Sequence, residues 1–190
     1  LLSERHPDVA GRLQAIGAAA GAKKGGTERD NPLLDLELSS TALEASCRLN
    51  PMDAESWSQL AHNRRCAGDL AGAALGFERV LALSGRRDFA ALTSLASVRR
   101  EMGEPEPALA HLQAALAVGA PPSPSATAET RAAQHEAGMA LMELGRHEDA
   151  GLVFEAVIDA EPDAAESWAA LGVCLSALGQ PEAALACQRQ

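Results

Sequence analysis

The sequence predicts an all-α fold, and two features of its composition carry that prediction. Alanine, the strongest helix former, accounts for 41 of the 190 residues. Residues that favour strands are scarce, since the chain has five aromatic residues, no tyrosine and two isoleucines. With 47% hydrophobic residues the chain can bury a core. No apolar run reaches the roughly 18 residues that cross a bilayer, so we expect no membrane insertion.

A pattern of glycine and alanine recurs along the chain with a period of about 34 residues. Each of four glycines is followed five residues later by an alanine: Gly68 by Ala73, Gly103 by Ala108, Gly145 by Ala150, and Gly179 by Ala184. The phrase Ala-Glu-Ser-Trp also occurs twice, ending at Trp57 and at Trp168, and each tryptophan lies eleven residues before one of these glycines. The chain therefore consists of internal repeats.

Each period predicts two helices, because apolar residues recur three or four positions apart on both sides of the glycine. The glycine fits the end of the first helix, where the backbone turns left-handed. Pro105 and Pro181 follow two residues later, inside the first turn of the second helix, where their missing N–H costs nothing. Asp53, and Asp163 together with Glu166, are predicted to cap the starts of first helices.

In these positions the chain resembles the tetratricopeptide repeat, whose pattern is W-x2-L-G-x2-Y, then A-x3-F, then P. The residues that match are Trp57, Leu60, Ala61, Ala73 and Phe77, then Gly138, Ala150, Phe154 and Pro162, and finally Trp168, Leu171, Gly172 and Ala184. The departures are Arg64, Arg99, Leu141 and Leu175 at the tyrosine position, and Leu92 and Gln134 at the tryptophan position. The resemblance implies a right-handed α-solenoid of stacked antiparallel helix pairs, with weaker packing where the tyrosine is lost.

The register of the repeats divides the chain. Complete repeats are expected at 54–87, 89–122 and 131–164, an incomplete repeat at 165–190, a Pro/Ser-rich connector at 123–130, and the second helix of a degenerate repeat at 32–53. Residues 1–31 are expected to form a helix and a linker. They are either the first helix of that degenerate repeat, with an insertion at 21–30, or a separate segment that belongs to an upstream region.

The resemblance also implies that the first helices line a concave groove that binds other polypeptides. By helical phase, the groove residues are Ser58, His62 and Arg65, then Thr93, Ser97 and Arg100, then His135, Met139 and Met142. Ala132 and Glu166 share this phase. The lining changes from polar to apolar, which suits an extended peptide or an amphipathic helix of a partner protein. For each single residue, an ordinary solvated side chain remains the alternative. Reversing the charge of both Arg65 and Arg100 is expected to weaken binding of an acidic segment and to leave stability unchanged.

Several partners and ligands are excluded. The formal charge of −10 repels nucleic acid. Ser58 and His62 stand where family members that bind chaperone C-termini carry lysine and asparagine. The asparagine ladder of members that accompany a glycosyltransferase is absent too, since its positions hold Gln59, Ser94, Glu136 and Ala170. The partner is therefore a protein that the sequence does not identify.

No catalytic residues, metal site or cofactor site are expected within these residues. His135 and Glu136 begin like the zinc motif HExxH, but Met139 stands at the position of the second histidine. Lys23-Lys24-Gly25-Gly26 lacks the spacing of a phosphate-binding loop. The four cysteines form no CxxC pair, and their scatter indicates a reducing, cytoplasmic location.

Two functions follow. The first is a protein-interaction scaffold with no enzymatic activity in these residues. The alternative is the substrate-recruiting region of a larger protein-modifying enzyme, a transferase or hydroxylase, whose catalytic domain lies outside the chain. The chain starts at Leu1 without methionine and breaks off within a repeat at Gln190, so we expect an excerpt whose open C-terminal end allows self-association.

Overall fold

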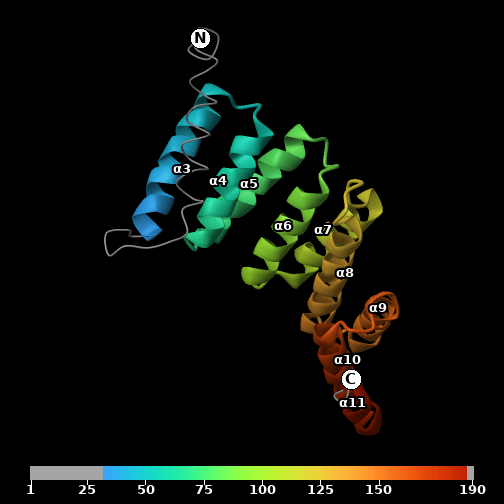
Figure 1. Cartoon of the computed structure of the whole chain (residues 1–190). Helices are drawn as coiled ribbons and strands as arrows, with labels where there is room; N and C mark the ends of the chain where they lie inside the picture. Colours follow the sequence, from blue (N-terminus) through green and yellow to red (C-terminus); the bar gives the residue numbers. More distant parts are fainter. Residues whose placement is uncertain (1–31, 188–190) are drawn as a thin grey trace. The chain divides into compact units, whose positions relative to one another are not determined.

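In the computed structural model, the described residues 32–187 form nine helices and no strand (Figure 1). The all-α prediction is thus confirmed for this part of the chain. The expected N-terminal helix and linker at 1–31 lie outside the described residues. The chain divides into two compact units, Leu1–Ala91 and Leu92–Gln190.

Three helices form the described part of the first unit: α3 (Pro32–Leu49), α4 (Ala54–Cys66) and α5 (Leu70–Leu83). Helix α4 packs against both of the others. Its contact with α5 is close, since a Cβ atom added to Gly76 would lie 2.7 Å from the Cβ atom of Ala61. A small residue on each helix therefore sets their separation.

Helix α3 has the register of a second helix. It carries the fully buried Ser39 and Leu43 where the later helix α9 carries Ala150 and Phe154. The Ser39 hydroxyl accepts a hydrogen bond of 2.7 Å from Asn63 Nδ2 of α4, which satisfies its polar group inside the interface.

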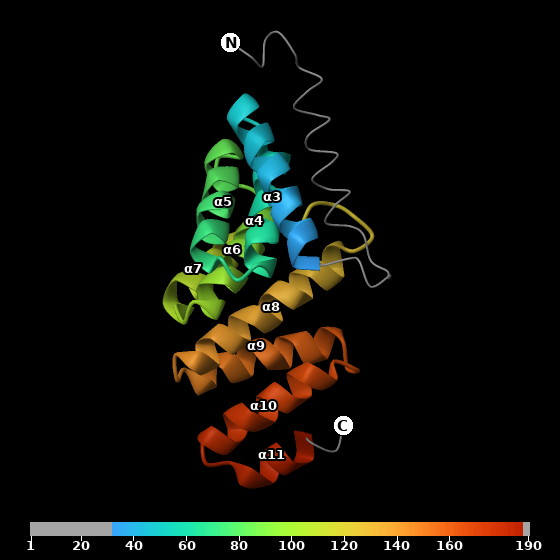
Figure 2. The same cartoon turned by 90° about the vertical axis from the view of Figure 1, so that its left-hand side faces the viewer.

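The second unit holds the remaining helices, including all of α6 except its first turn. These are α6 (Phe89–Glu101), α7 (Pro105–Val118), α8 (Ala126–Glu143), α9 (His147–Ala160), α10 (Ala165–Ala177) and α11 (Pro181–Cys187). From α7 onwards each helix packs against the next one in the chain. Figure 2 shows α8 to α11 side by side in chain order.

A left-handed glycine follows the end of each of four helices, as the sequence predicts. Gly68 has a φ of 83°, and its N–H donates to the Arg65 carbonyl oxygen at 3.0 Å, while the next N–H, of Asp69, donates to Arg64 at 2.9 Å. Together these bonds satisfy two carbonyl groups that the end of α4 leaves open. The same pair of bonds recurs at Gly103, Gly145 and Gly179.

The two predicted caps have different outcomes. Asp53 caps α4, because its Oδ1 atom accepts a hydrogen bond of 3.2 Å from the Glu55 N–H. The prediction for Asp163 is wrong, because the N-cap of α10 is Ala164, whose side chain makes no capping bond. In the repeat register Asp163 corresponds to Met52, which lies one residue before the capping residue Asp53.

Helix α8 begins at Ala126, inside the range that the sequence assigns to the connector, and has 18 residues where α4, α6 and α10 have 13. The prolines up to Pro124 prevent an earlier start, but the following Ala-Thr-Ala-Glu-Thr run contains no helix breaker. The connector is therefore shorter than predicted, and α8 gains more than one N-terminal turn.

Candidate functional site

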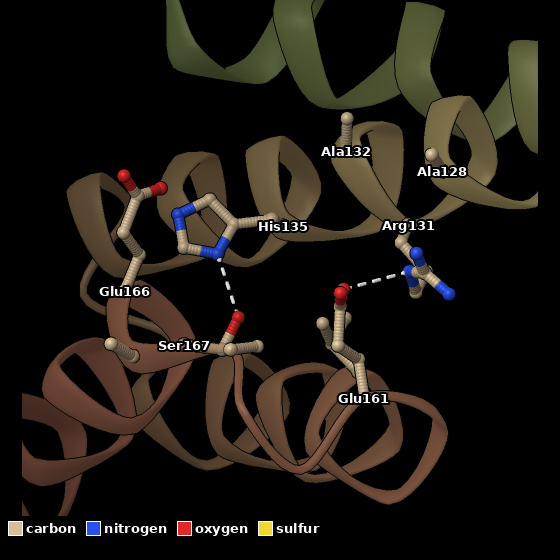
Figure 3. Close-up of a pocket in the computed structure, with 10 residues that line it drawn as sticks. Ala128, Arg131, Ala132, His135, Glu161, Glu166 and Ser167 are labelled. Atoms are coloured by element: carbon tan, nitrogen blue, oxygen red, sulfur yellow. Dashed lines mark hydrogen bonds and ion pairs between the residues drawn. The ribbon is translucent and has the colours of Figure 1, made fainter. Parts of the chain in front are cut away.

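A hollow of about 400 Å³ lies between α8 and α10 in the second unit (Figure 3). Its lining residues are Ala128, Arg131, Ala132 and His135 of α8, Val157 of α9, Glu161 and Ala164 of the following turn, and Ala165, Glu166 and Ser167 of α10. Both α8 and α10 are first helices of their repeats, so the hollow opens between adjacent repeats.

The hollow exists because alanines occupy four of these positions. In the repeat register, Ala132 stands where α4 has Glu55, and Ala164 stands where it has the capping residue Asp53. Each replacement removes a carboxylate-bearing side chain and leaves one methyl group. The extra turn of α8 contributes a further small side chain, Ala128. These parts of the walls are consequently apolar.

His135 is held in a fixed orientation. Its Nδ1 atom and the hydroxyl of Ser167 lie 3.0 Å apart, and either group can be the donor. The ring also packs against Phe154, with 5.3 Å between ring centroids. Because Ser167 and Phe154 are both buried, neither partner can move easily. Among the described residues, the second ring nitrogen, Nε2, has no hydrogen-bond partner.

The charged residues that line the hollow differ in whether they have an ion-pair partner. Arg131 Nε lies 3.0 Å from Glu161 Oε2, so α8 is joined to the turn after α9 by an ion pair. Glu166 lies in the first turn of α10, where the helix dipole favours a negative charge. Among the described residues, this exposed carboxylate has no hydrogen-bond or ion-pair partner. Figure 3 shows it on the same side of the hollow as the His135 ring.

Of the nine residues predicted for the groove, His135 alone lines this hollow in the described part of the chain. Met139 and Met142 lie half-buried further along α8, and Thr93 and Ser97 are half-buried on α6. Ser58, His62 and Arg65 all belong to α4 in the first unit. Three of the nine predicted residues thus lie in the first unit and six in the second, and the groove as a whole stays a prediction.

Arg100 makes two ion pairs within the chain. Its Nη2 atom lies 2.9 Å from Glu136 Oε2, and its Nη1 atom lies 3.2 Å from Glu143 Oε1. Because 25% of the side chain is exposed, these pairs are partly shielded from water. The expectation that reversing this charge leaves stability unchanged does not fit this geometry, since a carboxylate here would repel two glutamates.

His62 lies on the surface of α4 with its ring against Phe77 of α5, at a centroid distance of 5.0 Å and an angle of 81°. Burial against this ring lowers the pKa of His62 from its ordinary value of 6.5, and the positive charge of Arg65 lowers it further. The lowered pKa therefore favours the neutral form of the imidazole.

A second hollow, of about 470 Å³, lies between α3 and α4 in the first unit and includes Cys47, Trp57, Leu60 and Arg64 in its lining. Arg64 occupies the tyrosine position of the repeat pattern. Its Nη2 atom lies 3.0 Å from Glu44 Oε1, so no aromatic ring from this position fills the hollow. Burial, with the charge of Asp53 second, raises the pKa of the Cys47 thiol to about 11. The thiol stays protonated and is a poor nucleophile or metal ligand.

Sequence reasoning missed Arg131, Glu161 and Ser167. Arg131 lies four residues before His135 and shares its face of α8, but the predicted groove lining started only at Ala132. Glu161 belongs to a turn, where helical phase does not apply. The sequence did contain a signal for Ser167, since this residue belongs to the repeated phrase Ala-Glu-Ser-Trp. The phrase established the repeat period, but no role was predicted for its serine. Its counterpart Ser56 also makes a buried bond, with 3.0 Å between its hydroxyl and that of Ser46.

Residues 32–187 contain no cluster of three or more His, Cys, Asp and Glu side chains suited to a metal ion. None of the helices in the same stretch combines the length and the apolar character that crossing a membrane requires.

The sequence model of the tetratricopeptide repeat matches residues 93–152 and 135–189, which together span just over half of the chain. No curated protein matches the chain significantly in sequence.

Solved structures show the same fold. The crystal structure of MamA protein has a TM-score of 0.81 at 17% identity, over 96% of this chain and 90% of that one. MamA 41-end from Desulfovibrio magneticus RS-1 has a TM-score of 0.78 at 19% identity, over 95% and 91%. YrrB, described as a TPR protein with an unusual peptide-binding site, has a TM-score of 0.75 at 19% identity, over 98% and 86%.

Proposed function

The chain belongs to the tetratricopeptide repeat family, and on that premise we propose that it binds an extended segment of a partner protein in the hollow between α8 and α10. Its fold is that of a protein-interaction scaffold. The solved structure of YrrB is described as containing a peptide-binding site, which supports a peptide as the occupant.

The observation that carries the proposal is the combination of a hollow partly lined by alanines with an oriented imidazole. A hollow of about 400 Å³ accommodates one large side chain of a peptide. His135 is fixed by Ser167 and Phe154, so it can bond to a ligand without first losing rotamer freedom. Met139 and Met142, further along the same helix, extend the surface with adaptable apolar side chains.

The proposal is tested by selecting peptides that bind the chain from a random library displayed on phage. Selected peptides are then titrated against wild type and against Ala132→Trp, which fills the hollow from the exposed wall of α8. The control is Ala156→Trp, the same change at an exposed position of α9 that does not line the hollow.

We expect Ala132→Trp to weaken binding by about tenfold or more and Ala156→Trp to leave it unchanged. Failure to select any peptide, or equal affinity of wild type and Ala132→Trp, would reject the hollow as the binding site.

No finding favours the alternative that the chain recruits substrates for an attached transferase or hydroxylase. The proposal includes the repeat boundaries derived from the sequence, with the connector shortened to 123–125, and a cytoplasmic location. The location is supported by the four cysteines, which are all free thiols.

A further inference from the structure

The negative charge of the chain is concentrated in the unit that contains the hollow. Residues 92–190 hold fourteen Asp and Glu and five Lys and Arg, which gives −9 of the formal charge of −10. The first unit is therefore nearly neutral. An electrostatic field of this sign attracts basic segments to the second unit and repels acidic ones.

The hollow has the same imbalance on a smaller scale. The charge of Arg131 is compensated by Glu161, at 3.0 Å, within the hollow itself. Glu166 adds a carboxylate for which the described residues provide no cation. A ligand that enters with a positive charge therefore meets an uncompensated negative one, and a ligand carboxylate would meet repulsion.

The walls favour one shape of cation. Ala128, Ala132, Val157 and Ala165 offer methyl groups along the sides, whereas Glu166 supplies the charge. The side chains of lysine and arginine combine an alkyl stem with a charged head, and they bury the stem against apolar surface while the head remains polar. Such a side chain matches both parts of the hollow.

We propose that the hollow binds a lysine or arginine side chain from a basic segment of the partner protein, with the charged head at Glu166. This inference rests on the proposed function and names the chemistry of the partner.

The inference is tested with three fluorescein-labelled peptides of about twelve residues. Alanine alternates with lysine in the first peptide, with serine in the second and with glutamate in the third. Fluorescence anisotropy gives their affinities for wild type, Glu166→Gln, Glu166→Lys and the control Glu155→Gln. Glu155 is exposed on α9 and does not line the hollow, so the control changes the net charge equally at a different place. Circular dichroism checks that each variant is folded.

We expect the lysine peptide to bind wild type most tightly and to lose about fivefold in affinity in Glu166→Gln, with a clearly smaller loss in Glu155→Gln. Glu166→Lys should shift the preference towards the glutamate peptide. Equal losses in Glu166→Gln and Glu155→Gln would show a general field effect and overturn the inference, as would no binding of the lysine peptide.

The inference and the proposed function can fail separately. If phage selection yields peptides without lysine or arginine that Ala132→Trp still excludes, the hollow binds peptides and only the basic partner is wrong. If Ala132→Trp has no effect on any selected peptide, the proposed function itself fails.

Discussion

The indole Nε1 atom of Trp168 donates a hydrogen bond of 2.8 Å to the backbone carbonyl oxygen of Pro162, six residues earlier. Trp57 makes the same bond to Pro51, at 3.1 Å. Each bond ties the start of a first helix to the turn that precedes it. At the other two turns the tryptophan position holds Leu92 or Gln134, so no indole is present to make this bond.

Replacing Trp168 with phenylalanine should lower the free energy of unfolding by about 0.5 to 1.5 kcal/mol, the net value of a typical hydrogen bond. The ring is kept, so most of the apolar packing is kept too. Urea denaturation followed by circular dichroism measures the change. Trp57→Phe is the matched variant in the first unit. If both variants unfold with the same free energy as the wild type, these two hydrogen bonds contribute nothing to stability.

Replacing Gly138 with alanine should destabilise the protein by about 1 to 3 kcal/mol, although alanine is the better helix former. The added Cβ atom would lie 2.6 Å from Cζ of the fully buried Phe154, which has no room to move. Gly151→Ala is the control in the adjacent helix, because its Cβ atom would meet only Leu171, at 3.7 Å. It should stabilise by about 0.5 to 1 kcal/mol. Thermal melting of the two variants should therefore shift in opposite directions.

Replacing Arg100 with glutamine should cost about 1 kcal/mol at low salt and less at about 1 M NaCl, where charge pairs are screened. The loss arises because Glu136 and Glu143 lose a shared cation. Arg146→Gln, which removes an exposed pair with Asp149, should cost less. Urea midpoints at the two salt concentrations measure both. Equal effects of the two variants would contradict the role of the partly shielded pairs.

His62 should make a contribution to stability that is lost as the pH falls from 7 towards 5. Because the pKa of His62 is lower in the folded chain than its ordinary 6.5, the unfolded chain binds the proton more readily as the pH falls through that range. NMR titration of the imidazole gives the pKa directly, and it should rise in Arg65→Ala, because the positive charge of Arg65 contributes to lowering it. An unchanged value in that variant would exclude the contribution of Arg65.

The elements were predictable because their signals are local. Helical spacing, glycines at helix ends and alanines at close contacts lie within one repeat, and Ala73, Ala108, Ala150 and Ala184 are all buried as that register requires. The predicted cap at Asp163 failed by one residue, because the position that corresponds to the capping residue Asp53 holds Ala164, which has no side-chain oxygen, and Asp163 stands one residue before it.

The site was much less predictable, because its contacts join residues about thirty positions apart. His135 meets Ser167, and Arg131 meets Glu161, only once α8, α9 and α10 are packed against each other. Similarly, the partners of Arg100 lie on the first helix of the next repeat. Helical phase shows which face a side chain occupies, but the neighbouring helix determines whether the residue is available to a ligand.

The longer α8 shows how one pair of neighbouring repeats acquires a hollow of its own. The additional turn after Pro124 adds Ala128 to the wall of the hollow, while the glycine and alanine within each flanking repeat stay five residues apart. Inserting residues 123–130 between two other repeats, with alanines at the matching positions, should therefore create a comparable hollow in other proteins built from such repeats.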